Sequence, residues 1–424
     1  MYPIIGSIFV NVMRKTFLLF GLAICIGQGS SFAQLTNPNQ LNGRELTLNT
    51  ITTAVPFLTI APDSRCGALG DAGVALDPDA NSTFWNASKL AFAEDQMEVS
   101  LSYSPWLRAL VNDMSLSYLS GYKKINKNQA IGGSLRYFTL GNITFTDEMG
   151  SVIMPFKPAE FAVDFTFAQK LSKNFSGGLA LRYVNSNLTG RTNVQGAESK
   201  PGQTVAVDIS TFYTNDKIKF AGKKAKLNWG MNISNIGAKM SYTNTDYRDF
   251  IPANLRTGVA FTSNMDQYNK LTLLVDVNKL LVPSPPIYKN NSDTILSGFN
   301  PNVGTASGII QSFYDAPGQY DPETETIYAG SKFREELREY NIGAGVEYDF
   351  AQQFAVRIGY FHEHYTKGNR QFITFGAGLH YQVLTIDMSY LVSTTQQNPL
   401  ANTLRFSLRF SLDAKTREEL ESDQ

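Results

Sequence analysis

The stretch Thr403–Leu412, TLRFSLRFSL, alternates between polar and apolar residues at every position. Successive side chains of a β-strand point to opposite faces, so the leucines and phenylalanines share one face and the arginines and serines share the other. One apolar and one polar face are typical of a membrane-barrel strand, with lipid outside and a polar lumen inside. The stretch therefore predicts a transmembrane strand close to the end of the chain.

The same alternation recurs upstream, for example over Phe354–Tyr360 and Phe161–Phe167. Counting such segments gives fourteen strands of about ten residues, an even number as single-chain bacterial barrels require. The expected fold is all-β, a 14-stranded antiparallel transmembrane β-barrel over residues 96–412. A soluble all-β protein is the alternative, but soluble strands seldom place phenylalanine and leucine outward so regularly.

The predicted connections alternate between short and long along the chain. One short connection joins the expected strands Thr204–Thr214 and Lys226–Asn235, whereas a long one covers residues 281–339. Outer-membrane barrels have short periplasmic turns and longer external loops. We therefore expect residues 281–339 to form an extracellular loop, and both termini to lie in the periplasm.

Composition and charge restrict the class of protein. The 424 residues carry 37 Lys+Arg and 37 Asp+Glu, so the formal charge is zero and no nucleic-acid partner is expected. Charged residues make up only 17%, while 20 tyrosines and 28 phenylalanines are present. Low charge with many aromatic residues suits strands that expose one face to lipid.

The N-terminus has the pattern of an export signal. Arg14 and Lys15 precede the apolar run Phe17–Ile26, and Ser31-Phe32-Ala33 supplies small residues for cleavage. Residues 1–33 are therefore expected to be a signal peptide, whose true start could be Met13. Residues 34–95 would form an N-terminal segment and plug, and residues 413–424 a charged periplasmic tail.

Several charged residues fall on the predicted inward face of the strands. Both signs occur, so they can pair with one another or with a plug, and this interpretation is preferred over a ligand site. The predicted lumen charges are Arg136, Asp164, Arg182, Asp208, Asp276, Glu347, Arg357, Asp387, Arg405 and Arg409.

A glycine- and aspartate-rich box, GALGDAGVALDPDANSTFWNAS, lies at residues 67–88, before the first strand. It lacks the Lys-Ser/Thr of a phosphate-binding loop and no βαβ unit surrounds it. Glycines allow tight turns and aspartates can bond to nearby amides, so the box is expected to fold as a compact plug against Arg405 and Arg409. The predicted plug residues are Gly67, Gly70, Asp71, Gly73, Asp79, Trp85 and Asn86.

Signals for catalysis are weak. His362-Glu363-His364 is a metal-like cluster, but it has no third ligand at a zinc spacing. There is no G-x-S-x-G elbow, and three histidines in all give little support for acid–base chemistry. We therefore expect no enzyme activity, no catalytic residue, no metal and no cofactor.

Loop 281–339 has its own composition. It begins with the rigid LVPSPP and contains GIIQSFYDAPG, whose apolar residues have helical spacing. Loops of this length usually have a function. We expect either a partner surface or a lid over the barrel mouth. The predicted partner-binding residues are Ile309, Ile310, Phe313, Tyr314 and Pro317.

The box at residues 64–92 resembles the N-terminal signature of FadL-like outer-membrane barrels, and most closely that of the PorV family. VDVNKLLVPSPP, GIIQSFYDAPG, FREELREYNIGAGVEY and KGNRQFITFGAGLHY extend the resemblance over nearly the whole mature chain. Two departures are visible, because Trp85-Asn86-Ala87-Ser88 lacks the usual proline and Cys66 replaces a small residue. The resemblance implies a FadL-like 14-stranded barrel with an N-terminal hatch.

The resemblance also implies a non-enzymatic role in the type IX secretion system. PorV-like proteins collect cargo with a C-terminal signal domain at the SprA-type translocon. They carry it to the PorU-type sortase, which attaches it to lipopolysaccharide in the outer membrane. Two alternatives stay open: a FadL-type transporter of hydrophobic small molecules, and a lipopolysaccharide deacylase, for which no Ser-His-carboxylate set is visible.

Overall fold

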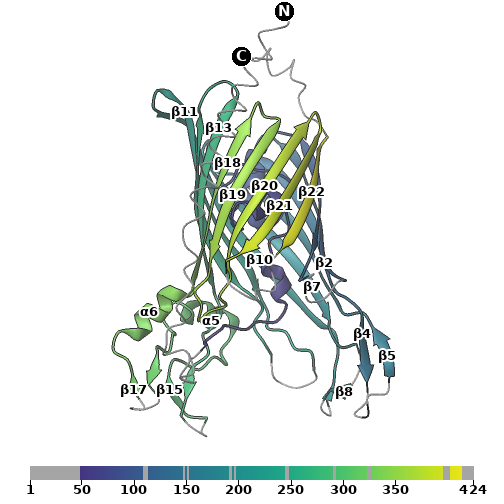
Figure 1. Ribbon diagram of the computed structural model, residues 1–424, viewed down its shortest axis with the longest axis vertical. Coiled ribbons are helices and arrows are strands. Elements are labelled where there is room, and N and C mark those ends of the chain that lie inside the picture. The colour runs from purple at the N-terminus through teal and green to yellow at the C-terminus, as the bar shows by residue number, and fades with distance from the viewer. Residues whose placement is uncertain are drawn as a thin grey trace, which may run out of the picture. The chain divides into compact units, whose positions relative to one another are not determined.

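Fourteen antiparallel strands close into one barrel in the computed structural model (Figure 1). The structure describes residues 48–107, 113–146, 149, 152–190, 193–194, 197–243, 248–289, 293–321, 324, 326–394 and 402–412. The barrel lies in the unit Asn49–Gln424, and its seam is the pairing of the first strand with the last. The strands, in order, are β1 (Met97–Pro105), β2 (Met114–Asn126), β3 (Gln129–Leu140), β6 (Ala159–Lys170), β7 (Phe175–Asn187), β10 (Gly202–Phe220), β11 (Lys223–Gly237), β12 (Asn254–Asn264), β13 (Asn269–Leu280), β18 (Tyr340–Phe350), β19 (Phe354–His362), β20 (Gln371–Tyr381), β21 (Leu384–Ser393) and β22 (Thr403–Ser411).

The two faces of the wall differ as the alternation predicts. On β22, Phe406, Leu408 and Phe410 are exposed on the outside. Arg405 and Ser407 on the same strand are buried inside the barrel. Exposure of so many aromatic and aliphatic side chains to water is unfavourable, whereas the same surface is stable in contact with lipid. The predicted 14-stranded antiparallel barrel is confirmed.

The two ends of the barrel are unlike. One end, the turn end, carries short hairpin turns such as Ala351–Gln353 and the turn at Gln382. The other, the loop end, carries long connections, which include residues 281–339 between β13 and β18. In Figure 1 the labelled helices and small hairpins of these connections gather at the bottom, at the loop end. Short and long connections therefore alternate along the chain.

The hairpin of β10 and β11 is longer than the sequence predicts. The expected strands end at Thr214 and restart at Lys226, whereas the observed pairing continues to Phe220 and Lys223. The turn at Ala221-Gly222 has positive φ at both positions, 50° and 80°, as two-residue hairpin turns favour. Ile218 and Phe220 alternate with Lys217 and Lys219, but the register shifts between Asn215 and Ile218, and this irregularity interrupts the alternation that the prediction relied on.

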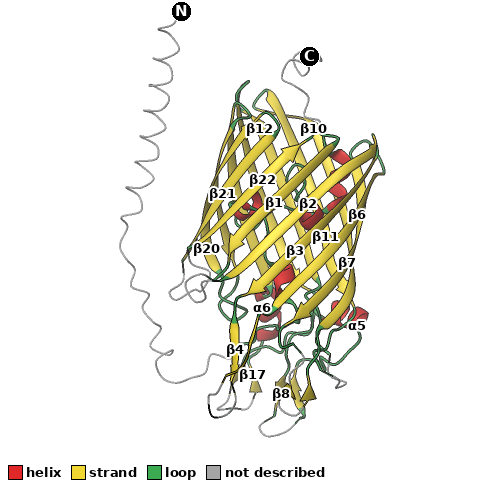
Figure 2. Cartoon of the chain, turned by 90° about the vertical axis from the view of Figure 1, so that its right-hand side faces the viewer, coloured by secondary structure: helices red, strands yellow, loops and turns green. Residues whose placement is uncertain are grey.

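Residues 49–95, here called the inner segment, pass through the barrel interior. The short helices of this segment are surrounded by strands in both views (Figures 1 and 2). Trp85, Leu69 and Ala72 are fully buried and share a cluster with Tyr118 of the wall. The helices are η1 (Pro56–Thr59), α3 (Ser64–Gly67), α4 (Ser82–Trp85) and η2 (Ala87–Phe92).

Short strands and two helices lie in the described part of the connections at the loop end. Among the described residues, no helix is long and apolar enough to cross a bilayer. The predicted signal peptide, residues 1–33, and the predicted tail, residues 413–424, lie outside the described residues. The loop elements are β4 (Ile143–Thr146), β5 (Val152–Phe156), β8 (Asn193–Val194), β9 (Ala197–Glu198), β14 (Ile287–Tyr288), β15 (Ile295–Ser297), α5 (Thr305–Gln311), β16 (Tyr320–Asp321), β17 (Thr326–Ile327) and α6 (Ser331–Arg338).

Candidate functional site

The inner segment is a compact unit built around one aspartate and one tryptophan. Asp63 caps α3 by accepting a hydrogen bond from Cys66 N at 2.9 Å. Its other carboxylate oxygen accepts from Trp85 Nε1 at 2.6 Å. Asn86 donates to Val74 O at 3.1 Å and to Thr211 O in the wall at 3.0 Å. The contacts of Asp63, and that of Asn86 with Val74, lie within the segment and fix its own shape, whereas the bond to Thr211 joins it to the wall.

The glycines of the box let the segment lie directly against the wall. Gly70 has φ of +71°, and a Cβ there would lie 2.4 Å from Tyr360 O on β19. Gly359 on the same strand is equally confined, because a Cβ would lie 2.0 Å from Gly70 N. Such distances exclude any side chain, so backbone packs on backbone here. Turns at the glycines of the box are expected from the sequence, but the matching glycine in the wall is not.

The segment's backbone and acidic groups are bound by charges in the wall. Asp276 on β13 accepts hydrogen bonds from Gly73 N at 2.7 Å and Val74 N at 2.9 Å. Arg405 on β22 pairs with Asp71 at 2.6 Å. A buried carboxylate that receives two backbone N–H groups is a strong anchor, because the bonds are charge-assisted. These contacts hold the box at residues 67–88 on two sides of the lumen.

Two wall arginines form a larger network nearer the turn end. Arg357 pairs with Glu347 at 2.6 Å and with Asp387 at 2.7 Å. Arg409 pairs with Glu98 at 3.2 Å and with Asp387 at 3.3 Å. The network is closed from the inner segment, where Arg65 binds Glu347 at 3.0 Å and Asp79 at 3.3 Å. The sequence analysis missed Arg65, because a residue outside the strands carries no alternation to reveal its direction.

The remaining predicted lumen charges lie on the opposite wall. Arg182 pairs with Asp164 at 2.5 Å and with Asp208 at 3.0 Å, all three buried. Arg136 donates to Leu58 O at 2.7 Å, and its guanidinium lies 4.6 Å from the centroid of the Phe84 ring. All the predicted lumen charges therefore face the interior, where most are paired, as expected of a filled lumen.

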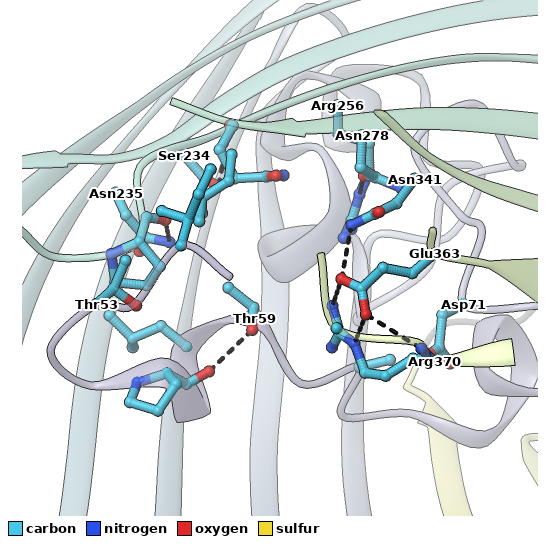
Figure 3. A pocket seen from close by; sticks show the side chains of 18 of the residues that line it. Thr53, Thr59, Asp71, Ser234, Asn235, Arg256, Asn278, Asn341, Glu363 and Arg370 are labelled. Carbon is cyan, nitrogen blue, oxygen red and sulfur yellow. Dashed lines mark hydrogen bonds and ion pairs between the residues drawn. The ribbon is translucent and has the colours of Figure 1, made fainter. Parts of the chain in front are cut away.

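A cavity of about 310 Å³ remains between the inner segment and the loop end. Figure 3 shows Arg256, Asn278, Asn341, Glu363 and Arg370 on one side of it, with other polar side chains across it. Half of its lining residues are amides or charged groups, and its apolar residues include Leu58, Phe84 and Phe361. Such a surface suits a polar ligand better than a hydrocarbon.

Loop 281–339 is fastened to the barrel by buried ion pairs. Lys279, at the end of β13, binds Glu336 at 2.7 Å and Glu339 at 2.8 Å. Lys367, between β19 and β20, binds Glu335 at 2.8 Å and Glu339 at 3.0 Å. Breaking buried pairs of this kind is costly, because a charge is then left unpaired away from water. The loop therefore presents a fixed surface.

One acidic cluster and the His362-Glu363-His364 motif can be compared with metal sites. Asp315, Glu336 and Glu339 lie close enough to share an ion, but the Lys279 ammonium already binds both glutamates. Burial raises the pKa of Asp315 to about 6. In the motif, the carboxylate of Glu363 is bound by Arg370 at 2.7 and 2.8 Å. In each case a side-chain cation of the protein itself, Lys279 or Arg370, already neutralises the glutamate carboxylates.

The predicted partner-binding residues are only partly at the surface. Ile310 is 64% exposed, and Phe313 and Tyr314 are exposed as well, whereas Ile309 is half-buried. Pro317 is buried, so the expectation that it offers a contact surface is wrong. The predicted helical run also stops early, because α5 ends at Gln311. Its last turn is capped by the backbone of Ser312, and the two aromatic residues follow it.

Comparison with known proteins identifies a family. The family model described as "Type IX secretion system protein PorV" matches residues 44–287. No curated protein matches the chain in sequence. The solved structures that it resembles include the Pseudomonas putida toluene transporter TodX, at 9% identity and a TM-score of 0.45, with 83% of this chain and 99% of that one covered.

Two further structures are similar to about the same degree. The Ralstonia pickettii toluene transporter TbuX is 10% identical with a TM-score of 0.43, covering 82% of this chain and 96% of that one. A Pseudomonas aeruginosa FadL homologue is 11% identical with a TM-score of 0.43, covering 86% and 99%. Scores this low assign neither a ligand nor a function.

Proposed function

This chain belongs to the PorV family of type IX secretion system proteins, and we propose that it is the cargo shuttle of that system. An apolar barrel exterior and the family together place it in the outer membrane as a component of the secretion machinery. In the proposed role it binds secreted proteins through their C-terminal signal domain at a SprA-type translocon. It then passes them to a PorU-type sortase, which attaches them to lipopolysaccharide.

The observation that carries the proposal is the apolar surface of loop 281–339. Exposed aromatic and aliphatic residues gathered on one loop outside the barrel wall favour a protein partner, and Phe299 and Tyr314 are in edge contact there. Because buried ion pairs fasten the loop, little conformational entropy would be lost on binding. The exposed residues of this surface are Phe299, Ile310, Phe313, Tyr314, Tyr328, Phe333 and Leu337.

A shuttle needs no bond-making step, so the proposal assigns no catalytic residue. It requires only that the loop end faces the cell surface and that the turn end faces the periplasm. The short turns and the long loops agree with that orientation. The predicted signal peptide would deliver the chain to the periplasm for insertion.

A transporter of hydrophobic small molecules is favoured less by the interior. Such a protein needs an apolar pocket, whereas half of the residues that line the cavity at the loop end are amides or charged groups. The inner segment occupies the lumen on the turn-end side of that cavity. We propose that it acts as a plug, which would prevent free diffusion through the barrel.

Surface substitutions on the loop test the shuttle. Ile310→Ser combined with Tyr314→Ser removes two exposed side chains without touching the buried ion pairs. We expect cargo to accumulate in the periplasm. We also expect a smaller amount of this variant to co-purify with the translocon. Leu171→Ser is the matched control, because Leu171 is 65% exposed but lies at the turn end.

The two outcomes separate clearly. If the loop variant secretes cargo normally while the barrel is present at wild-type amounts, this surface is not the cargo site. If Leu171→Ser blocks secretion equally, the loop end has no special role and the assignment of the partner surface is lost.

A further inference from the structure

A row of polar side chains crosses four neighbouring strands at the level of the loop-end cavity. Asn232 on β11 is opposite Arg256 on β12, which is opposite Asn278 on β13. Asn278 is in turn opposite Asn341 on β18. All four line the cavity, and this set is here called the amide row. Cross-strand neighbours lie close enough for their side chains to act on one molecule.

Arg256 has its orientation fixed by its neighbours. Its Nε donates to Asn278 Oδ1 at 2.5 Å. Its guanidinium lies 4.4 Å from the centroid of the Trp85 ring and 5.7 Å from that of Phe84. Aromatic rings shield the flat face of the guanidinium, so hydrogen bonds can form only at its edge. The terminal nitrogens are therefore presented in one direction.

Those terminal nitrogens form no ion pair within the described residues, although the buried carboxylate of Asp276 acts on Arg256 from farther away. Among the described residues, no carboxylate lies within 4.0 Å of Arg256, whereas Arg65, Arg182, Arg357, Arg370, Arg405 and Arg409 each have one. Arg136 also lacks a carboxylate, but two of its nitrogens are sealed from solvent. Arg256 is only half-buried and lines the cavity. It is thus the cation of the cavity wall that is left to bind something else.

The neighbouring charges leave room for an anion. Glu363 is neutralised by Arg370, and Asp71 by Arg405. Asn278 uses its oxygen for Arg256, which leaves its amide nitrogen as a donor facing the same cavity. A guanidinium edge beside an amide N–H matches the two oxygens of a planar carboxylate.

We propose that the amide row is a binding site for a carboxylate carried on a polar ligand, with Arg256 as its charged partner. The cavity of about 310 Å³ admits a small hydroxy acid or the free end of a peptide chain. Both sources share the carboxylate. This site lies inside the barrel mouth, so it is separate from the exposed surface of loop 281–339 and does not depend on the shuttle role.

Calorimetry on the full-length protein in detergent tests the site with two matched pairs of probes. Triglycine is compared with triglycine amide, and gluconate with glucose, so that each pair differs in the carboxylate. We expect the acid of at least one pair to bind and its neutral partner not to bind. Binding of gluconate alone identifies a free hydroxy acid as the source, and binding of triglycine alone identifies a chain end.

Variants then connect binding to the residue. Arg256→Met should weaken the acid by about 10- to 100-fold, as expected for the loss of a charge-assisted contact. Arg256→Lys should fall between, because it keeps the charge but not the bidentate geometry. Ser234→Ala, across the cavity in Figure 3, is the control and should bind as the wild type does.

The proposal is overturned by any of three results. Acid and neutral probes could bind equally or not at all, which would leave Arg256 as a support for Trp85. Phosphate could compete as well as the carboxylates at equal concentration, which would remove the preference for a planar anion. Arg256→Met could bind with unchanged affinity while folded to the same melting temperature, which would show that Arg256 does not touch the ligand.

Discussion

Gly359→Ala should release the inner segment from the wall. The new Cβ would lie 2.0 Å from Gly70 N and 2.2 Å from Leu69 C. Ordinary contact begins near 3.4 Å, so the segment must retreat by about 1.4 Å. Rotation of a side chain cannot relieve the overlap, because both partners are backbone.

The cost can be worked out from the contacts that are lost. Overpacking of a filled interior costs about 1–3 kcal/mol, and about 2 kcal/mol is taken for this overlap. Retreat also breaks the hydrogen bond from Gly70 N to Thr374 Oγ1, 3.0 Å long, worth about 1 kcal/mol. A loss of about 3 kcal/mol makes local opening about 100-fold more frequent.

Cys66 provides the assay, because it is buried in the inner segment and 2% exposed. In a Cys25→Ala background it is the remaining thiol of the chain. Maleimide labelling of Cys66 should therefore be about 100-fold faster in Gly359→Ala than in the parent. Gly177→Ala, whose Cβ meets nothing closer than 3.4 Å, should label at the parent rate.

Planar-bilayer conductance supplies the second readout, and it tests the plug directly. If the inner segment closes the lumen, Gly359→Ala should conduct ions more often than Gly177→Ala. Unchanged labelling of a barrel that still migrates as folded would refute the packing argument. Faster labelling without added conductance would keep the packing but refute the plug.

Two further predictions concern the anchor in the wall and the fastening of the loop. Asp276→Ala leaves Gly73 N and Val74 N without acceptors, so the free energy of unfolding should drop by about 2–5 kcal/mol in urea titrations. Asp276→Asn keeps one acceptor oxygen, so its loss of stability should be smaller. Equal losses in the two variants would contradict the role of the carboxylate. The pKa of Asp315 is about 6, against 3.8 for the ordinary group, so Asp315 takes up a proton when the loop folds at a pH between these values. The loop should therefore lose stability as pH rises from about 4 through 6. Amide exchange in residues 281–339, corrected for the intrinsic effect of pH, should be slower at pH 5 than at pH 7.5. Asp315→Asn should abolish this difference, and a difference that persists would assign it to another group.

The barrel could be predicted because alternation is local to each strand. The period of two placed Phe406 outside and Arg405 inside without any knowledge of the neighbouring strands. The same rule fails where an irregularity shifts the register of a strand, as between Asn215 and Ile218 of β10. The PorV-family resemblance, which rested on the box and the loop motifs, was confirmed by the family match.

The site could be predicted only in part, because register is a relation between strands. Alternation placed Asp276 inside the barrel, but nothing in β13 alone reveals that Gly73 N and Val74 N would meet its carboxylate. The amide row was missed for the same reason, since Arg256 and Asn278 become neighbours only through pairing. Burial of Pro317 depends on how loop 281–339 folds back on itself, which no periodic pattern encodes.

The order of the chain gives the inner segment a place in assembly. Residues 49–95 leave the ribosome before any strand, yet Ser64 N donates to Ser407 Oγ on the last strand, 343 positions later. This contact can form only after β22 has been synthesised, so it belongs to a late step of assembly. Because β22 is one of the two seam strands, a bond from the inner segment to β22 also helps to hold the seam. An alteration that loosens the inner segment should thus slow biogenesis as well as open the finished protein.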